Sequence, residues 1–231
     1  MFGPIKNFIF DLDGTLIDSM GSAFEGFVGL LEEKYSIKIG RQDLVPHLGK
    51  NPREIFSVWL KEEKHLNEMM KIWDDWCADI KIEKVPAFDG VHELLELLHE
   101  KNLNKFIYTG RDRKGAITFL KLHGWWNKYF NEDTLYAGDQ GFAPKPSPEA
   151  LHHLMEKFKL SHDETLFTGD SEKDVIAGNS AGIKTAAALW DLAPFEGKTH
   201  RMRFKNAWQM WDQYSPDLRL SSPRELISWI K

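Results

Sequence analysis

Short apolar runs alternate with helical patterns along this chain. Five runs, flanked by Gly, Asp or other turn residues, are typical of buried strands: residues 7–10, 105–108, 134–137, 165–168 and 184–189. Between them, apolar residues recur at helical spacing, as in Val91, Leu94, Leu95 and Leu98, and in Ala150, Leu151, Leu154 and Phe158 after Ser147 and Pro148. Because parallel strands need right-handed helical crossovers, the alternation predicts an α/β fold, a doubly wound parallel sheet with a Rossmann-like core.

One interval breaks this alternation. The first strand ends near Phe10 and the second begins near Lys105, whereas a strand–helix–strand crossover needs only about 30 residues. The extra residues in this interval carry three apolar helical faces: Phe24, Phe27, Val28 and Leu31; Ile55, Val58 and Trp59; and Met69, Ile72, Trp73 and Trp76. Since no strand interrupts it, a separate unit is favoured over helices that only cover the sheet. The sequence therefore predicts a core of residues 1–16 and 86–231 and an inserted helical cap domain of residues 17–85.

Composition and charge narrow the classes of protein. The 231 residues are 42% hydrophobic and 28% charged, typical of a globular chain. With 30 Lys+Arg against 35 Asp+Glu, the net charge of −5 argues against a broad basic surface, so we expect no nucleic-acid partner. No apolar run approaches the roughly 18 residues of a membrane span, and the N-terminal residues lack the apolar stretch of a signal peptide. The single Cys77 cannot form an internal disulfide. We expect no membrane partner and a cytoplasmic location.

Side chains that could take part in catalysis or ligand binding follow the predicted strands. In doubly wound sheets, ligands bind outside the carboxyl ends of the strands. These ends carry Asp11, Asp13 and Gly14 after the first strand, Thr109, Gly110 and Arg111 after the second, and Asp170 and Asp174 after the fourth, while Lys145 lies in a Pro-rich stretch before a helix. Neighbouring carboxylates repel unless a cation neutralises them, and oxygen ligands without His or Cys favour Mg²⁺ over zinc. The set predicts a Mg²⁺ site beside a phosphate cradle, with phosphoryl transfer to an aspartate.

Four segments, in this order, resemble the motifs of the haloacid dehalogenase superfamily. They are Phe10-Asp11-Leu12-Asp13-Gly14-Thr15-Leu16, Thr109-Gly110-Arg111, Lys145 within Lys-Pro-Ser-Pro, and Gly169-Asp170 with Asp174. One such motif alone is weak evidence for the superfamily, because Asp-x-Asp-Gly is common in calcium loops and turns. Four in order at strand ends, over nearly the whole chain, are a strong signal. The helical insert likewise resembles the cap of phosphoglycolate phosphatase-like members.

The resemblance implies catalytic roles for three residues. Asp11 would attack phosphorus and form an aspartyl phosphate. Asp13 would protonate the leaving oxygen and then activate water for the second half-reaction. Lys145 would stabilise both the nucleophile and the charge on the phosphoryl group.

The resemblance also implies binding roles. Thr109 and the loop at Gly110 would hold phosphate oxygens, and Arg111 would either face the phosphate or form a surface ion pair. Mg²⁺ would be bound by Asp11, Asp170 and the carbonyl of Asp13. For Asp174, a water-mediated ligand and a first-turn helix acid favoured by the helix dipole remain open alternatives.

Departures from other members narrow the expected reaction. Asp13 argues against dehalogenation, because halide leaving groups need no protonation. Ala23 stands where sugar phosphomutases carry a His, so a mutase of the β-phosphoglucomutase type is an alternative only. Lys50 and Arg53 in the cap are candidates to clamp a carboxylate or a second phosphate, which keeps a pyrophosphatase open, although each also fits a solvated surface residue.

The sequence thus predicts a Mg²⁺-dependent phosphatase acting on a small phosphorylated metabolite, as a monomer or homodimer. A non-catalytic binding module would need a lost nucleophile or acid, and neither is missing. The stretch 191–215 is longer than a simple strand-to-strand link and predicts an extra helix or a surface for another subunit.

Overall fold

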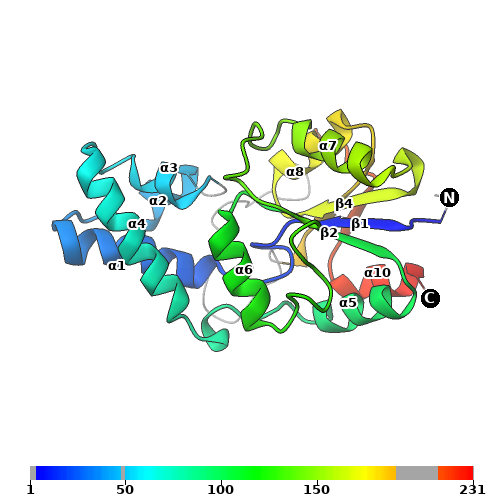
Figure 1. Ribbon diagram of the computed structural model, residues 1–231, viewed down its shortest axis with the longest axis horizontal. Coiled ribbons are helices and arrows are strands. Elements are labelled where there is room, and N and C mark those ends of the chain that lie inside the picture. The colour runs from blue at the N-terminus through cyan, green and yellow to red at the C-terminus, as the bar shows by residue number, and fades with distance from the viewer. Residues whose placement is uncertain (1–3, 48–49, 191–212, 231) are drawn as a thin grey trace.

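The computed structural model describes residues 4–47, 50–190 and 213–230 (Figure 1). Six strands form one parallel sheet in the order β3-β2-β1-β4-β5-β6. Their bounds are β1 (Asn7–Phe10), β2 (Asn104–Tyr108), β3 (Leu135–Tyr136), β4 (Thr165–Gly169), β5 (Lys184–Ala188) and β6 (Leu218–Leu220). The predicted α/β doubly wound sheet is confirmed, with β1 at its centre. Of the stretch 191–215, residues 191–212 lie outside the described residues.

The sixth strand was not predicted from the sequence. β6 has three residues and pairs only with β5, at the edge of the sheet. Its middle residue, Arg219, is exposed, so the strand lacks the continuous apolar run of the five buried strands. A short edge strand of this kind is recognisable only once its neighbour is in place.

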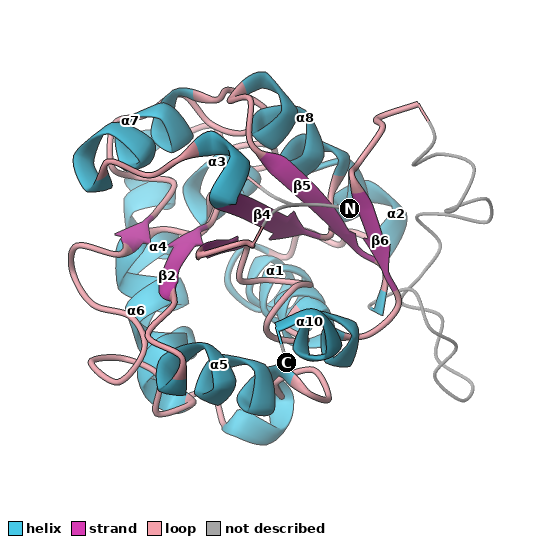
Figure 2. Ribbon diagram, turned by 90° about the vertical axis from the view of Figure 1, so that its right-hand side faces the viewer, coloured by secondary structure: helices cyan, strands magenta, loops and turns pink. Residues whose placement is uncertain are grey.

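Helices cover both faces of the sheet (Figure 2). Successive side chains of a strand point to opposite faces, so Phe8 and Phe10 of β1 join one apolar cluster and Ile9 joins another. The first cluster includes helices α5 (Val91–Glu100), α6 (Arg113–Leu122) and α10 (Pro223–Ile230), and the second includes α7 (Glu149–Phe158) and α8 (Glu172–Ser180). The described residues also contain three 3₁₀ helices, η1 (Val45–His47), η2 (Ile82–Lys84) and η3 (His162–Glu164).

The remaining helices form a second body beside the carboxyl ends of the strands (Figure 1). They are α1 (Met20–Tyr35), α2 (Arg41–Leu44), α3 (Pro52–Phe56) and α4 (Glu63–Ala78), and they enclose an apolar cluster of their own. The rings of Phe27 and Trp73 stack 4.3 Å apart at its centre. Gly26 makes this approach possible, because a Cβ there would lie 2.8 Å from the Trp73 ring. The helical content predicted for the insert is therefore present.

Two chain crossings join this helical body, named the cap below after the sequence prediction, to the sheet. Ile17 and Val85, at the two ends of the insert, are buried in the cluster of α5, α6 and α10. The crossings bond to each other, since Asp18 N donates to Pro86 O at 2.8 Å. His123 Nε2 donates to Val85 O at 2.9 Å and ties the second crossing to α6. These contacts hold the cap helices over the strand ends where the sequence predicts the site.

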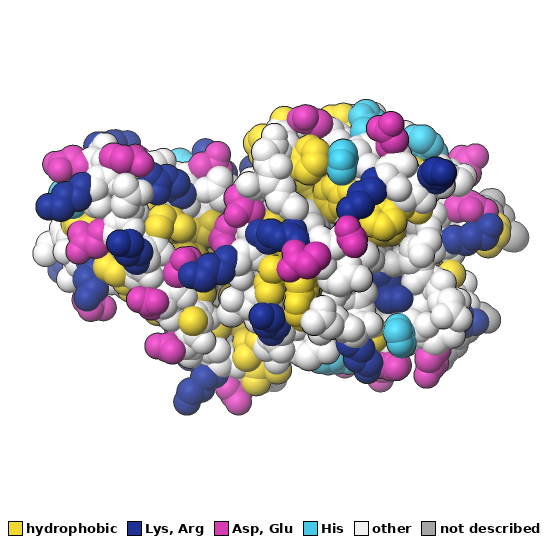
Figure 3. All heavy atoms as spheres, in the orientation of Figure 1, with side chains coloured by type: hydrophobic (Ala, Val, Ile, Leu, Met, Phe, Trp, Pro, Cys, Tyr) yellow, Lys and Arg dark blue, Asp and Glu magenta, His cyan; other side chains and the backbone are white. Residues whose placement is uncertain are grey.

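Charges of both signs are interspersed over the face shown in Figure 3. Among the described helices, none combines the length and apolarity that a membrane crossing requires.

Candidate active site

The loop after β1 carries the first two aspartates. Asp11 N continues the strand pairing by donating to Thr168 O at 2.9 Å, which places the Asp11 side chain at the end of β1. Gly14 turns the loop with a φ of +81°, a conformation that side-chain-bearing residues rarely adopt. A Cβ at Gly14 would lie 2.5 Å from Asp170 Oδ2. Glycine therefore allows both the turn and the close approach of Asp170 from the end of β4.

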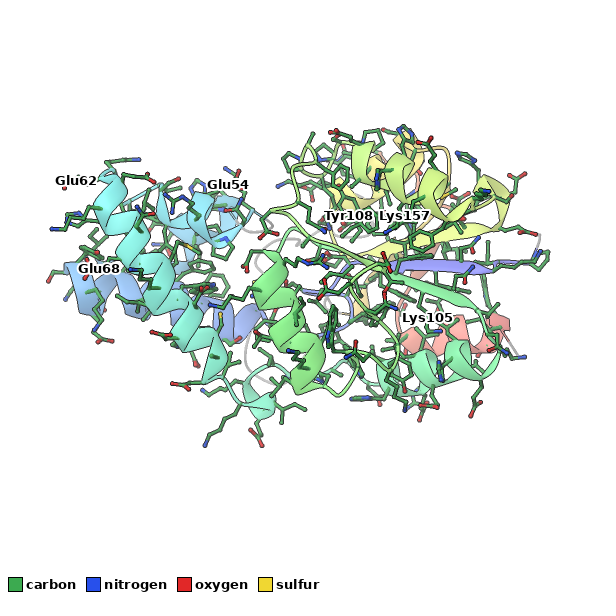
Figure 4. The ribbon with its side chains drawn as sticks, viewed as in Figure 1. Glu54, Glu62, Glu68, Lys105, Tyr108 and Lys157 are labelled. Carbon is green, nitrogen blue, oxygen red and sulfur yellow. The ribbon has the colours of Figure 1, made fainter. Side chains whose placement is uncertain are left out.

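Lys145 joins two of the acids in a buried cluster. Its Nζ donates to Asp11 Oδ1 at 2.8 Å and to Asp174 Oδ1 at 2.5 Å. Tyr108, labelled at the end of β2 in Figure 4, accepts a third hydrogen bond through its carbonyl at 3.3 Å. The side chains of Lys145, Asp11 and Asp174 are only 9%, 8% and 2% exposed, so water screens these ion pairs weakly.

Burial and charge act in opposite directions on this cluster. Burial raises the pKa of Asp11, against the attraction of the Lys145 ammonium. Burial by itself would lower the pKa of Lys145, but the Asp11 and Asp174 carboxylates outweigh it and raise that pKa above its ordinary value. Lys145 consequently stays charged and is a fixed positive centre at the end of the sheet.

Asp174 uses both carboxylate oxygens, one at the start of α8 and one toward Lys145. Its Oδ2 accepts from Ser171 N at 3.0 Å and from Ser171 Oγ at 2.5 Å, which forms a capping box at the start of α8. Its Oδ1 accepts from Lys145. Gly169 permits this packing, because a Cβ there would lie 2.3 Å from Asp174 Cγ. Asp174 is therefore both a first-turn helix acid and a member of the cluster.

Three carboxylates are close enough together to share a cation. Each of Asp11, Asp170 and Asp174 offers an oxygen, and these oxygens lie within 4.8 Å of one another. A donor set of carboxylate oxygens alone fits Mg²⁺. The sequence predicts a contact from Asp13 through its carbonyl oxygen; its side chain is not in this group and accepts from Arg111.

Asp13 is paired with Arg111. Arg111 Nε donates to Asp13 Oδ2 at 2.9 Å and Nη2 donates to Oδ1 at 2.6 Å, a two-point geometry. Ser19 Oγ also donates to Asp13, and the Arg111 guanidinium lies 4.3 Å from the centre of the Phe119 ring. Burial favours the neutral acid, but Arg111 outweighs it and the pKa of Asp13 is lowered. Arg111 is thus a buried partner of Asp13 rather than a member of a surface ion pair, and it also lines the pocket described below.

Thr109 and Gly110 lie beside this pair at the end of β2. Thr109 is buried, its N donates to Tyr136 O at 2.9 Å, and its Oγ1 accepts from Arg111 N at 3.1 Å. A hydroxyl that accepts one bond still has a proton to donate. Both residues line the same pocket as Asp11 and Lys145.

The pocket lies between the sheet and the cap. Its core side is formed by Asp11, Asp13, Thr109, Gly110, Arg111, Lys145, Asp170, Ser171 and Lys173. Its cap side is formed by Ser19, Met20, Ala23, Phe27, Lys50, Pro52, Ile55 and Trp73. Lys50 therefore lies where the sequence predicted a substrate contact. Arg53 does not line the pocket: it bonds Asn67 Oδ1 at 3.0 Å and forms an ion pair with Glu63 inside the cap.

The sequence assigned no role to several pocket residues. The partnership of Ser171 with Asp174 was detectable, because Ser-x-x-Asp before an apolar run is a capping signature. No sequence signal identified Ser19 as a partner of Asp13, or Phe27 and Trp73 as parts of the pocket wall. Their helical spacing indicates only that they are buried.

Comparison with known proteins agrees with this geometry. The family model described as haloacid dehalogenase-like hydrolase matches residues 8–188. The chain belongs to this family of hydrolases. A pyrophosphatase PpaX from Halalkalibacterium halodurans is 31% identical over 182 residues, which cover 79% of this chain and 82% of that protein.

Solved structures show the same fold at low sequence identity. One, described as a predicted phosphoglycolate phosphatase from Haemophilus somnus, superposes with a TM-score of 0.76 at 18% identity and covers 98% of each chain. A family hydrolase from Deinococcus radiodurans with bound phosphate and sodium has a TM-score of 0.67 at 17% identity, over 96% of this chain and 93% of that one.

Proposed function

We propose that the protein is a Mg²⁺-dependent phosphatase that hydrolyses a phosphate monoester of a small metabolite through an aspartyl phosphate. The proposal rests above all on Lys145, whose ammonium lies 2.8 Å from Asp11 Oδ1 at the base of the pocket. A carboxylate held against a buried ammonium can approach an anionic phosphate with less repulsion. The second acid of the loop, Asp13, lines the same pocket.

In the first half-reaction, an Asp11 oxygen forms a bond to phosphorus while the bond from phosphorus to the ester oxygen breaks. Asp13 gives a proton to that leaving oxygen. The Thr109 hydroxyl and the Gly110 N–H hold phosphate oxygens, and Lys145 offsets the charge that gathers on them. Because Asp13 must be protonated for this step, its ion pair with Arg111 has to open when substrate enters.

In the second half-reaction, water attacks the phosphorus of the aspartyl phosphate. Asp13 takes a proton from that water, the bond to Asp11 breaks, and inorganic phosphate leaves. Both aspartates return to their starting states. Asp11, Asp170, Asp174 and the carbonyl of Asp13 would hold Mg²⁺, whose positive charge would neutralise phosphate oxygens.

The test is phosphate release from p-nitrophenyl phosphate in the presence of Mg²⁺. Asp11→Asn removes the nucleophile and is expected to reduce the rate to background. Asp133→Asn is the matched control, because Asp133 is an exposed acid paired with Lys157 away from the pocket. Asp11→Asn with unchanged activity would contradict the proposal.

A pyrophosphatase is the second candidate. The observations that favour it are the name of the relative at 31% identity and two ammonium groups that line the pocket in addition to Lys145, those of Lys50 and Lys173. A mutase is disfavoured because Ala23 presents only a methyl group to the pocket. We expect phosphate release from a sugar monophosphate without accumulation of an isomer, measured by NMR of the phosphorus nuclei.

The remaining expectations concern organisation. We propose that residues 17–85 act as a cap over a catalytic core of residues 1–16 and 86–231. Within the described residues one chain supplies every pocket-lining group, so a monomer or a homodimer is expected to be active. Light scattering of the active protein measures this state. The cytoplasmic location remains a prediction.

A further inference from the structure

The cap side of the pocket is mostly apolar. Met20, Ala23 and Phe27 reach it from α1, Ile55 from α3 and Trp73 from α4. We call these five residues the apolar wall. Phe27, Ile55 and Trp73 are buried in the cap's own cluster, so the wall is held in place by the packing of the cap. The leaving group of the substrate, which departs when the phosphoryl group is transferred, therefore lies against this surface.

The cap offers this surface a single cation. Among the described cap residues that line the pocket, Lys50 carries the only charge. Arg53 is engaged with Asn67 and Glu63 within the cap. Glu62 and Glu68 lie on the part of the cap remote from the sheet, as Figure 4 shows. On the cap side, the leaving group therefore meets the Lys50 ammonium and the apolar wall.

This surface suits some leaving groups better than others. The leaving group of pyrophosphate is a second phosphate. On the cap side its oxygens would lose water against Phe27 and Ile55 with Lys50 as the compensating ammonium, while Lys173 lines the core side of the pocket. An organic leaving group gains instead, because each methylene removed from water favours binding about fourfold. One anionic group on such a molecule matches the charge of Lys50.

We propose that the apolar wall selects phosphate monoesters whose leaving group combines an apolar body with one anionic group, and that it disfavours pyrophosphate. The inference rests on the proposed phosphatase function and adds the class of substrate. It assigns Lys50 to the anionic group and the apolar wall to the body of the leaving group.

A graded series of substrates tests the wall. The series consists of phosphate esters of 2-hydroxy acids bearing hydrogen, methyl, isopropyl or benzyl at the carbinol carbon, so each leaving group carries one carboxylate. We expect kcat/KM for phosphate release to rise about fourfold with each carbon that contacts the wall. Pyrophosphate, with release divided by two, is expected to fall below the methyl-bearing ester.

Matched variants separate the two contacts. Met20→Ala shortens the wall and should lower the benzyl-to-hydrogen ratio of kcat/KM about fourfold or more. Met70→Ala should leave that ratio unchanged, because Met70 is also a half-buried methionine of the cap cluster but does not line the pocket. Lys50→Ala should lower kcat/KM for the carboxylate esters about tenfold relative to ethyl phosphate. Lys64→Ala, an exposed cap lysine away from the pocket, is its control.

The outcomes distinguish this inference from the proposed function. A flat or falling series, a preference for pyrophosphate, or equal effects of Met20→Ala and Met70→Ala overturns the inference, provided that p-nitrophenyl phosphate is hydrolysed and Asp11→Asn is inactive. Release of no phosphate from any of these compounds removes the proposed function and the inference together.

Discussion

Arg111 donates a hydrogen bond to each carboxylate oxygen of Asp13, with N–O distances of 2.9 and 2.6 Å. The Arg111 side chain is 8% exposed and that of Asp13 is 28% exposed, so the pair faces the pocket on one side only. The guanidinium also packs against the ring of Phe119 in α6, and this contact helps to hold the guanidinium in place. The acid proposed for catalysis is thus oriented by a cation on the neighbouring strand end.

Removal of Arg111 is expected to cost stability. Arg111→Ala leaves the Asp13 carboxylate without its main partner, which should lower the free energy of unfolding by about 1–3 kcal/mol. Arg111→Lys keeps the charge but loses the two-point geometry, so a smaller decrease is expected. Urea unfolding measures both. Arg224→Ala, which breaks an exposed pair with Asp89, serves as control and should change stability little. An equal effect of Arg111→Ala and Arg224→Ala would show that the buried geometry contributes nothing.

Asp13→Asn should separate the two half-reactions. Without its acid, a poor leaving group should depart about 10²- to 10⁴-fold more slowly. An activated aryl phosphate hardly needs that proton, so it should still phosphorylate Asp11 but then be hydrolysed slowly. The expected signature is a burst of aryl alcohol, with phosphate retained on Asp11 in the mass spectrum. Loss of the burst itself would mean that Asp13 is required for the attack.

Activity should depend on Mg²⁺. The carboxylate oxygens of Asp11, Asp170 and Asp174 are hard ligands, so EDTA is expected to abolish aryl phosphate hydrolysis and added Mg²⁺ to restore it. Ca²⁺ should inhibit, because its larger and more variable coordination shell aligns the reacting atoms less well. Full activity after exhaustive chelation contradicts the predicted metal.

Gly14→Ala should weaken Mg²⁺ binding beyond its effect on backbone strain. The new Cβ would lie 2.5 Å from Asp170 Oδ2, so the carboxylate would have to move. Gly141→Ala is the matched control, since Gly141 has a similar φ of +86° but nothing within 4 Å of the added Cβ. Both variants should lose about 1–2 kcal/mol of stability to the left-handed backbone. Only Gly14→Ala should raise the Mg²⁺ concentration needed for half-maximal activity. If the two variants gave similar Mg²⁺ titrations, displacement of the Asp170 carboxylate by the new Cβ would be ruled out.

Two glycines of α1 test the packing of the cap. Gly26→Ala puts a Cβ 2.8 Å from the Trp73 ring, whereas Gly29→Ala meets nothing within 4 Å. Ala favours a helix interior over Gly by about 1 kcal/mol, so Gly29→Ala should stabilise the protein. Gly26→Ala should destabilise it, because overpacking costs about 1–3 kcal/mol. Thermal unfolding compares the two variants. If both stabilised the protein, the tryptophan rings beside Gly26 would have moved without loss of packing energy.

Some of this arrangement follows from the chain alone. The strand order along the sequence and the polar residues directly after each strand place Asp11, Thr109 and Asp170 at one edge, because the carboxyl ends of parallel strands meet there. The helical insert was likewise predictable, since apolar residues at helical spacing continued where a crossover should have ended. Both features depend on local periodicity and on connectivity.

Only the tertiary structure decided which side chains face one another. The sequence made both Arg111 and Arg53 candidates for substrate binding, yet one pairs with Asp13 beside the pocket and the other with Glu63 within the cap. Phe27 and Trp73, 46 positions apart in the sequence, stack because two cap helices pack around Gly26. β6 likewise exists only through its pairing with β5. A helical or strand period determines which face of an element is buried, but the distance between two side chains depends on how the elements pack, and that packing is set by contacts that are remote in sequence.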